Sequence, residues 1–254
     1  MTSDEQAGLK AYVADLHVHT VLSPCAAVEM IPPLIVRQAL AKGINLAAIT
    51  DHNASANVRA VQGAAIDTDL AVLPGIELQT YEEVHLLCLF DTLVQLEAWQ
   101  QVVDARLPPV RNYPKLFGEQ FVVDETGRFI RREERLLTIS ADITLKEAVT
   151  HVARLGGLAI PAHVDRPAFS LFANLGFVPP DVPIAALDIS CHITPSTAHS
   201  RFPQLGDYPL IRSGDVHHLG DFCPKTVFTM ATPTLSEIRR AFLGQEGRSV
   251  TIRE

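Results

Sequence analysis

The residues of this chain that could do chemistry stand at the ends of short apolar segments. Five candidate strands end in DLHVH, TDH, PGIE, PAH and SGDVH, and a sixth begins with EEVH. Imidazole and carboxylate together suit zinc, manganese or iron rather than calcium, which prefers an all-oxygen shell. The candidate metal ligands are therefore His17, His19, His52, Glu77, His85, His163, Asp215 and His217.

The spacing of these residues has a geometric reason. Alternate residues of a strand face the same side, so His17 and His19 can reach one cation, as can Asp215 and His217. A single H-x-H pair is usually incidental, but six histidines and two acids at strand ends indicate a metal site. Eight ligands exceed the needs of one four-coordinate ion. We therefore predict two to three divalent ions bridged by a carboxylate such as Glu77.

Other catalytic arrangements find little support in the sequence. There is no G-x-S-x-G elbow, no Walker loop and no G-x-G-x-x-G fingerprint. His151, in a predicted helix, and His199, in a predicted loop, are expected to be structural or solvated. His192 and His218 adjoin predicted site strands, so each is a candidate for contacting substrate phosphate or for acid-base work.

The elements that must position these residues alternate along the chain. We predict strands at 11–18, 44–50, 70–78, 84–90, 158–163, 185–190 and 209–215, and helices at 32–42, 54–65, 93–106, 145–155 and 235–243. Strands that alternate with helices imply parallel pairing, and about seven such units favour a barrel over an open sheet. The active site of a parallel barrel lies at the carboxyl ends of its strands, so the ligands should converge at one mouth.

The alternation breaks once, between residues 107 and 137. This segment contains three prolines, a D-E-T-G turn and a run of basic and acidic residues. We interpret it as an insertion into a single domain spanning 1–254, a hairpin with a short helix over the barrel mouth. It is either a lid over the substrate or a mobile segment on the protein surface.

Bulk composition limits the function classes. Hydrophobic residues make up 47% of the chain and charged residues 20%, as in ordinary globular proteins. No apolar run could span a bilayer, and the polar N-terminal stretch does not resemble a secretory signal. The four cysteines show no paired spacing, which predicts a reduced, cytoplasmic protein. A net charge of −8 predicts a small phosphorylated substrate or nucleotide and no long nucleic-acid track, and nothing indicates a membrane partner or an oligomeric state.

The ordered motifs DLHVHT, ITDHN, PGIE, EVHLL, PAHVDR and SGDVH resemble those of the polymerase and histidinol phosphatase (PHP) superfamily. The resemblance runs from about Ala14 to the C-terminal helix. It implies a distorted (β/α)7 barrel and a trinuclear metal site that hydrolyses phosphoesters. One metal position would use His17, His19, Glu77 and Asp215, a second Glu77, His85 and His163, and a third His52 and His217.

The third position is where the chain departs from the family. Relatives place an Asp or His in the loop after the H-x-H pair, whereas this loop reads TVLSPCA. Cys25 is either a thiolate ligand for zinc or iron, or a small buried residue. Arg166 matches a position where relatives contact phosphate, and the alternative is a salt bridge with Asp165 or a neighbour.

These residues predict a hydrolase that acts through a hydroxide bridging two metal ions. Glu77, Asp215 and Arg166 would be catalytic, and Asp15 and Asp51 would orient the histidines. The expected substrate is a small phosphomonoester, a nucleotide or a short oligonucleotide, with manganese, zinc or iron as the metal. The alternatives are hydrolysis of a non-phosphate bond and a non-catalytic, metal-binding regulatory domain.

Overall fold

The computed structural model describes residues 8–253; residues 1–7 of the polar N-terminal stretch and residue 254 lie outside the described part. In chain order its main elements are β1 (Lys10–Val18), α1 (Pro32–Ala41), β2 (Leu46–Ile49), α2 (Val58–Ala64), β3 (Ala71–Gln79), β4 (His85–Leu89), α3 (Leu93–Arg106), α4 (Pro114–Phe117), β5 (Phe121–Val123), β6 (Phe129–Arg132), α5 (Leu145–Arg154), β7 (Leu158–Pro161), α6 (Leu171–Asn174), β8 (Leu187–Ser190), α7 (Pro195–Arg201), β9 (Leu210–Ser213), β10 (Thr226–Met230), α8 (Leu235–Phe242) and β11 (Ser249–Ile252).

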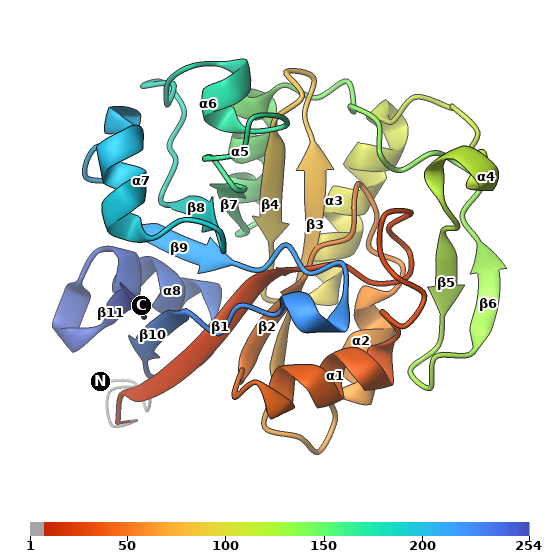
Figure 1. The fold of residues 1–254 in the computed structure, drawn as a ribbon, viewed down its shortest axis with the longest axis horizontal. Helices are drawn as coiled ribbons and strands as arrows, with labels where there is room; N and C mark the ends of the chain where they lie inside the picture. The colour runs from red at the N-terminus through yellow and green to blue at the C-terminus, as the bar shows by residue number, and fades with distance from the viewer. Residues whose placement is uncertain (1–7, 254) are drawn as a thin grey trace.

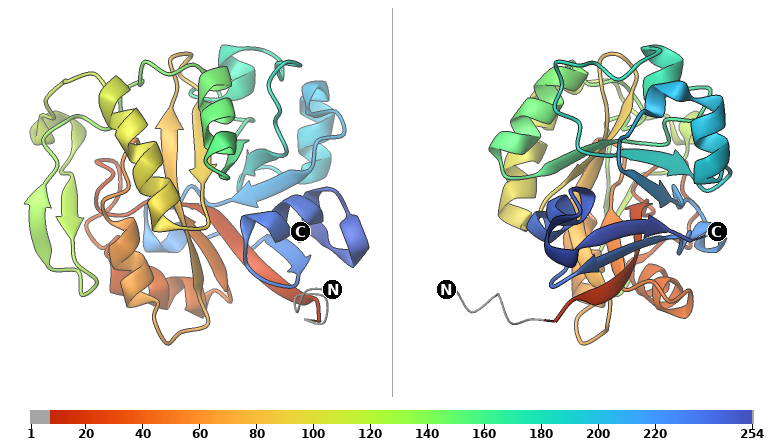
Figure 2. Two further views of the ribbon diagram at one scale, coloured as in Figure 1. Left: turned by 180° about the vertical axis from the view of Figure 1, so that it is seen from behind. Right: turned by 90° about the vertical axis from the view of Figure 1, so that its left-hand side faces the viewer.

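The main sheet has seven strands in the order β11-β10-β1-β2-β3-β4-β7, and it curls into part of a barrel (Figures 1 and 2). Strands β1, β2 and β3 pair in parallel, but β4 is antiparallel to both β3 and β7, and β10 is antiparallel to both β1 and β11. Strands β8 and β9 form a separate parallel pair.

This architecture confirms a mixed α/β fold with a curled sheet but not the expected count of seven strand-helix units. A short turn, not a helix, joins β3 to β4, so these strands form an antiparallel hairpin. Strands β10 and β11 were not predicted either. They complete the sheet beside β1 and pair with each other.

The sheet is apolar on both faces, as its alternating side chains require. In β2, Ala47 and Ile49 belong to the larger core beneath the helices, whereas Leu46 and Ala48 belong to a second core on the opposite face. Helices α3 and α5 cover the outer side of β3, β4 and β7 (Figure 2). Polar groups are therefore left to the strand ends and the loops, where the candidate ligands lie.

The 107–137 segment contains the predicted short helix, α4, and the predicted hairpin, β5–β6. The hairpin lies at one side of the molecule, beside the loop between β1 and α1 (Figure 1). The Phe121 amide donates to the Val21 carbonyl (3.0 Å), and the Asn57 side-chain amide donates to the Phe121 carbonyl (3.0 Å). The insertion thus packs against the loop that carries Cys25.

Two helical predictions differ from the structure for local reasons. The helix expected at 54–65 is shorter, because Asn53 takes a positive φ of 49° and its side chain binds the carbonyls of Leu137 and Ile139. His199, expected in a loop, lies in α7, which the Thr194 hydroxyl caps by accepting from the Thr197 amide. Among residues 8–253, no helix is long and apolar enough to cross a bilayer.

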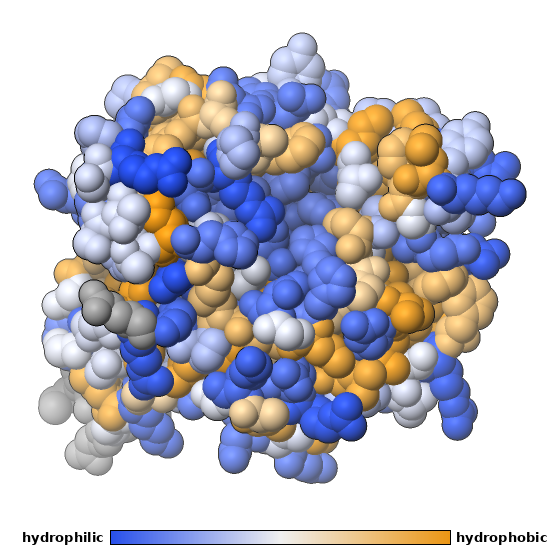
Figure 3. Space-filling model, in the orientation of Figure 1, coloured by the Kyte–Doolittle hydropathy of each residue, from blue (hydrophilic) through white to orange (hydrophobic). Residues whose placement is uncertain are grey.

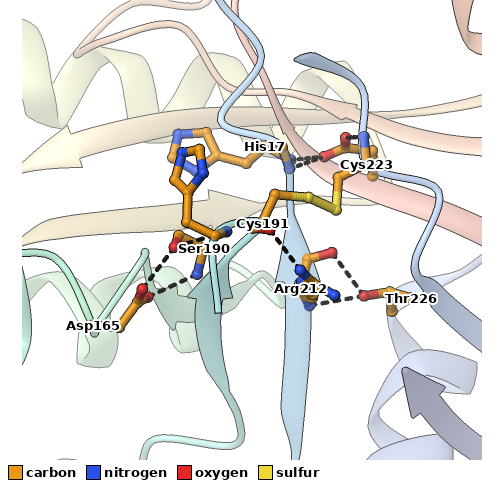
Figure 4. The surroundings of a disulfide bond; sticks show 10 residues. His17, Asp165, Ser190, Cys191, Arg212, Cys223 and Thr226 are labelled. Carbon is orange, nitrogen blue, oxygen red and sulfur yellow. Dashed lines mark hydrogen bonds between the residues drawn. A yellow bond between two sulfur atoms is a disulfide. The ribbon is translucent and has the colours of Figure 1, made fainter. Parts of the chain in front are cut away.

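Two of the four cysteines are paired, contrary to the expectation that all stay reduced. Cys191 follows β8, Cys223 precedes β10, and their disulfide joins positions 32 residues apart with a Cα–Cα distance of 6.4 Å (Figure 4). Sequence spacing did not indicate this pair, because the fold brings the two loops together. The Cys223 amide also donates to Asp15 Oδ2 (2.8 Å), so the bridge adjoins the base of the candidate site.

This disulfide is expected to contribute to stability by restricting the unfolded chain. Replacing both cysteines with serine should lower the free energy of unfolding by about 2–4 kcal/mol, the range for loops of this size. Urea denaturation with and without a dithiol reductant measures this. Reductant should destabilise the wild type to the level of the double variant and leave the variant unchanged. Equal midpoints for all samples would contradict the prediction.

Candidate metal centre

The candidate site is organised around the buried carboxylate of Glu77, in β3. Five imidazole nitrogens surround it: His17 Nε2 (3.0 Å), His85 Nδ1 (2.9 Å) and His163 Nε2 (3.3 Å) face Oε1, and His52 Nδ1 (2.8 Å) and His19 Nε2 (3.4 Å) face Oε2. Asp215 closes the cluster, with Oδ1 at 3.2 Å from His17 Nε2 and 3.1 Å from His19 Nε2. The fold thus brings together side chains from six separate strand ends.

Direct hydrogen bonding does not satisfy this cluster. His17 Nδ1 and His163 Nδ1 are buried without a hydrogen-bond partner, and His52 Nδ1 and Glu77 Oε2, although 2.8 Å apart, are not aligned for a hydrogen bond. Buried polar atoms are rarely left unpaired, and a metal-binding site is one setting that explains them. Ligand atoms of three groups lie within 4.8 Å of one another: His17, His19, Glu77 and Asp215; His52, Glu77 and His85; and His19, His52 and His217. The residues present therefore fit several divalent ions.

These groups partly match the metal positions implied by the family resemblance. The first implied set, with His17, His19, Glu77 and Asp215, is reproduced in full. In the second, His52 is grouped with Glu77 and His85 in place of His163, although His163 Nε2 lies 3.3 Å from Glu77 Oε1. The position that holds His52 and His217 also includes His19, which the resemblance assigned to the first set.

The electrostatics of the cluster keep the carboxylates of Glu77 and Asp215 ionised. Burial alone would raise the pKa of Glu77, but the positive charges of His17, His85 and His52 hold it well below its usual range. Burial would also raise the pKa of Asp215, and its interactions with His17 and His19 lower it. Burial lowers the pKa of His19 well below its ordinary value, so that imidazole is neutral, the form that binds metals.

Strand direction explains why one edge receives all these groups. His17 and Glu77 lie near the carboxyl ends of the parallel strands β1 and β3. His85 begins β4, and because β4 is antiparallel to β3 its start lies at the same edge, paired with Gln79. His163 and Asp215 adopt positive φ values of 30° and 48°. Such strained conformations in residues other than glycine are concentrated at functional sites.

Buried acidic residues hold the ligands in position, but only some of them orient a histidine ring as predicted. Asp51 accepts from the Thr20 amide, the Thr20 hydroxyl and the Ser23 hydroxyl (2.7 Å each), and Ser23 Oγ lies 2.8 Å from His19 Nδ1. Asp51 therefore orients His19 through Ser23.

Asp15 acts on backbone rather than on an imidazole ring. Its carboxylate accepts from the amides of His17, Gly214 and Cys223, which ties β1 to the loops after β9 and before β10. Burial raises the pKa of Asp15 to about 7 despite these hydrogen bonds.

Sequence reasoning missed Asp188, in β8. Its Oδ2 accepts from the His163 amide (3.0 Å) and lies 4.0 Å from His17 Nδ1. Burial raises its pKa to about 7. An acid inside the apolar run AALDIS was the available signal, because acids are rarely buried without a partner.

Three predicted substrate contacts have different surroundings. Arg166 does not pair with Asp165, which binds Ser190 (Figure 4); instead its Nη1 lies 2.5 Å from Asp215 Oδ2, at the rim of the cluster. His218 faces Asp221 (3.2 Å), with 63% of its side chain exposed. His192 is exposed, and its amide donates to the Ser190 hydroxyl.

Cys25 is not the buried residue that one interpretation expected. It is exposed, and its Sγ lies 3.0 Å from His217 Nε2. Burial alone would raise the pKa of the thiol, but hydrogen bonds with His217 and His52 lower it to about 6.

The molecular surface beside the site is divided into polar and apolar areas. Hydrophilic residues gather in the middle of the face drawn in Figure 3, with a hydrophobic area between them and the hairpin. An apolar pocket lies on this side, lined by Val21, Val28, Ile31, Phe121, Val123, Gly127, Phe129 and Arg132. The β1–α1 loop thus separates a polar centre from an apolar pocket.

Known proteins share this fold. No family model matches the chain. Uncharacterized protein YqxK of Bacillus subtilis is 24% identical over 95% of the chain, which spans 64% of that relative. The lesion-specific endonuclease PfuEndoQ of Pyrococcus furiosus superposes with a TM-score of 0.70 at 21% identity, over 95% of this chain and 58% of that one. A metal-dependent phosphoesterase, described as putative, of Bifidobacterium adolescentis superposes with a TM-score of 0.56 at 18% identity, over 84% and 90% of the two chains.

These likenesses show that the chain shares its fold with proteins described as an endonuclease and as a metal-dependent phosphoesterase, as the motif resemblance implied. The chain spans less than two thirds of the length of YqxK and PfuEndoQ. They also overturn one prediction. A structure of Endonuclease Q bound to a 27-mer duplex with an abasic lesion at its active site superposes with a TM-score of 0.63 at 20% identity, over 94% of this chain and 58% of that one. The expectation of no long nucleic-acid track was therefore wrong, because it rested on net charge, whereas binding depends on local charge at the site.

Proposed function

We propose that this chain is a metal-dependent phosphoesterase that hydrolyses phosphodiester bonds in DNA. The observation that carries the proposal is the convergence of five imidazoles on the buried carboxylate of Glu77, with Asp215 beside it and Arg166 at the rim. The fold shared with an endonuclease that binds damaged duplex DNA supports the choice of substrate. Two to three ions of manganese, zinc or iron would occupy the cluster.

Each part of the site has a distinct task in this scheme. Bound divalent ions would supply the Lewis acidity that activates water and offsets phosphate charge. Glu77, which contacts histidines of all three ligand groups, holds neighbouring positions together. Arg166 faces Asp215 in this structure and is 37% exposed, so its guanidinium can turn toward a phosphate at the rim and bind two of its oxygens. Asp51, through Ser23, keeps the His19 ring oriented.

The direct test is hydrolysis by protein reconstituted separately with Mn²⁺, Zn²⁺ and Fe²⁺. Substrates would be duplex DNA with an abasic site, undamaged duplex, single-stranded DNA, bis-p-nitrophenyl phosphate and p-nitrophenyl phosphate. We expect metal-dependent cleavage of diester substrates that a chelator abolishes. Release of phosphate from the monoester alone would contradict the DNA assignment. No hydrolysis of any substrate by fully loaded protein would contradict the enzymatic assignment.

Arg166→Ala is expected to lower kcat/KM for DNA cleavage by about 10²-fold, because one charged donor to the reacting phosphate is lost. Metal content should stay unchanged, since the guanidinium is not a ligand. Arg166→Lys should recover part of the loss, as a point charge replaces a bidentate donor.

Arg37→Ala, on the exposed side of α1, is the matched control and should behave as wild type. Wild-type kcat/KM in Arg166→Ala would exclude a phosphate-contacting role for this residue.

A further inference from the structure

The ligand group of His19, His52 and His217 differs from the other two in its charge. Each of the others includes the carboxylate of Glu77, and one of them also includes Asp215. This group has imidazoles alone. A divalent ion held by neutral imidazoles keeps its full charge, so an anionic ligand nearby would stabilise it.

His52 and His217 each have their Nδ1 atom directed toward a neighbouring acidic residue. His52 Nδ1 lies 2.8 Å from Glu77 Oε2, and His217 Nδ1 lies 2.8 Å from the Asp215 carbonyl oxygen. Donation from His217 Nδ1 to that carbonyl leaves Nε2 as the nitrogen that can bind a cation, as in many metal sites. This Nε2 faces Cys25.

Cys25 is placed to complete this group. Its Sγ lies 3.0 Å from His217 Nε2, and the thiol also contacts His52. His52 is 5% exposed, and its Nδ1 lies 2.8 Å from Glu77 Oε2 without the alignment of a hydrogen bond. The thiol therefore belongs to a cluster whose buried member is itself unsatisfied, which an isolated surface cysteine would not show.

The loop that carries Cys25 is held on both sides. The Ala27 amide donates to the His217 carbonyl (2.9 Å), and the Ser23 hydroxyl donates to Asp51 (2.7 Å). Gly118 of the insertion approaches so closely that an added Cβ would lie 2.0 Å from the Pro24 carbonyl oxygen. These contacts fix the thiol toward the histidines before any ligand binds.

We propose that the Cys25 thiolate completes a third metal position with His52 and His217, and that it makes this position selective for a thiophilic ion such as zinc over manganese. Thiolate with imidazole is a ligand set that favours zinc or iron, whereas manganese prefers oxygen ligands. The inference concerns the same site as the proposed function, and it predicts metal content rather than catalysis.

The test uses zinc and cobalt as probes. After equilibration with excess Mn²⁺ and limiting Zn²⁺, followed by gel filtration, the wild type should retain one more zinc ion per chain than Cys25→Ser. Cobalt-loaded wild type should show a near-ultraviolet thiolate-to-cobalt charge-transfer band that Cys25→Ser lacks. Cys88→Ala is the matched control, because Cys88 is a free thiol buried in the core, and it should keep both the zinc and the band. Equal zinc content and equal spectra in all three proteins would overturn the proposal.

An alkylation experiment needs no variant, so it remains decisive if Cys25→Ser folds poorly. Iodoacetamide should modify exposed Cys25 in metal-free protein, and zinc should slow the reaction at least about tenfold by occupying the thiolate. Unchanged labelling with zinc would refute ligation by Cys25. If zinc binding depends on Cys25 but the protein hydrolyses no substrate, this inference is supported and the proposed function is contradicted. If the protein shows metal-dependent hydrolysis but binds zinc equally well without Cys25, the proposed function is supported and this inference is contradicted.

Discussion

Replacing Glu77 with glutamine is expected to lower DNA hydrolysis by at least about 10³-fold, equivalent to ~4 kcal/mol of activation free energy. Glu77 contacts five imidazoles and contributes the carboxylate of two ligand groups, so its charge supports more than one ion. A neutral amide of nearly the same shape keeps the packing but removes that charge. Elemental analysis should show loss of metal in parallel with loss of activity.

Glu97→Gln provides the control, because Glu97 is an exposed carboxylate on α3 that pairs with Arg59. It should retain wild-type metal content and rate. A Glu77→Gln protein with full metal content and wild-type rate would remove the basis of the metal assignment. Full metal content with a large loss of rate would show that Glu77 acts in catalysis more than in metal retention.

Asp51→Ala is expected to destabilise the metal-free protein by about 3–5 kcal/mol. The carboxylate accepts three hydrogen bonds in a fully buried position, and its removal leaves the Thr20 amide, the Thr20 hydroxyl and the Ser23 hydroxyl without their acceptor. Each unsatisfied buried donor costs about 1–3 kcal/mol, and neighbouring costs are not fully additive. Urea denaturation in the presence of a chelator measures the change without a contribution from metal binding.

Two further variants separate stability from function. Asp69→Ala, at an exposed position, should unfold like the wild type. Ser23→Ala removes the link between Asp51 and His19 and the acceptor of the His52 amide, but it leaves both Thr20 hydrogen bonds to Asp51. It should therefore cost less stability than Asp51→Ala while weakening metal binding. If Asp51→Ala unfolded at the wild-type urea concentration, the hydrogen-bond network would not be the support described above.

The sequence alone was enough to predict the candidate ligands and most of the elements that carry them. Apolar strands followed at once by histidine or acid are a local pattern, and strand periodicity shows which neighbours share a face. His17, His19, Glu77 and Asp215 were predicted to converge, and their ligand atoms form one group. The capping box of Thr144 and Glu147 is likewise local, and both of its hydrogen bonds are formed.

Tertiary structure decided everything that depends on long-range pairing. The antiparallel direction of β4 brings His85 to the same edge as Glu77, and periodicity carries no information on direction. Cys191 and Cys223 pair because β8 and the loop before β10 end side by side, which spacing along the chain does not encode. Asp188 and Cys25 come to lie beside His163 and His217 in the same way, through contacts between segments far apart in the chain. Local pattern therefore predicts which side chains are available, whereas strand direction and loop packing determine which of them meet.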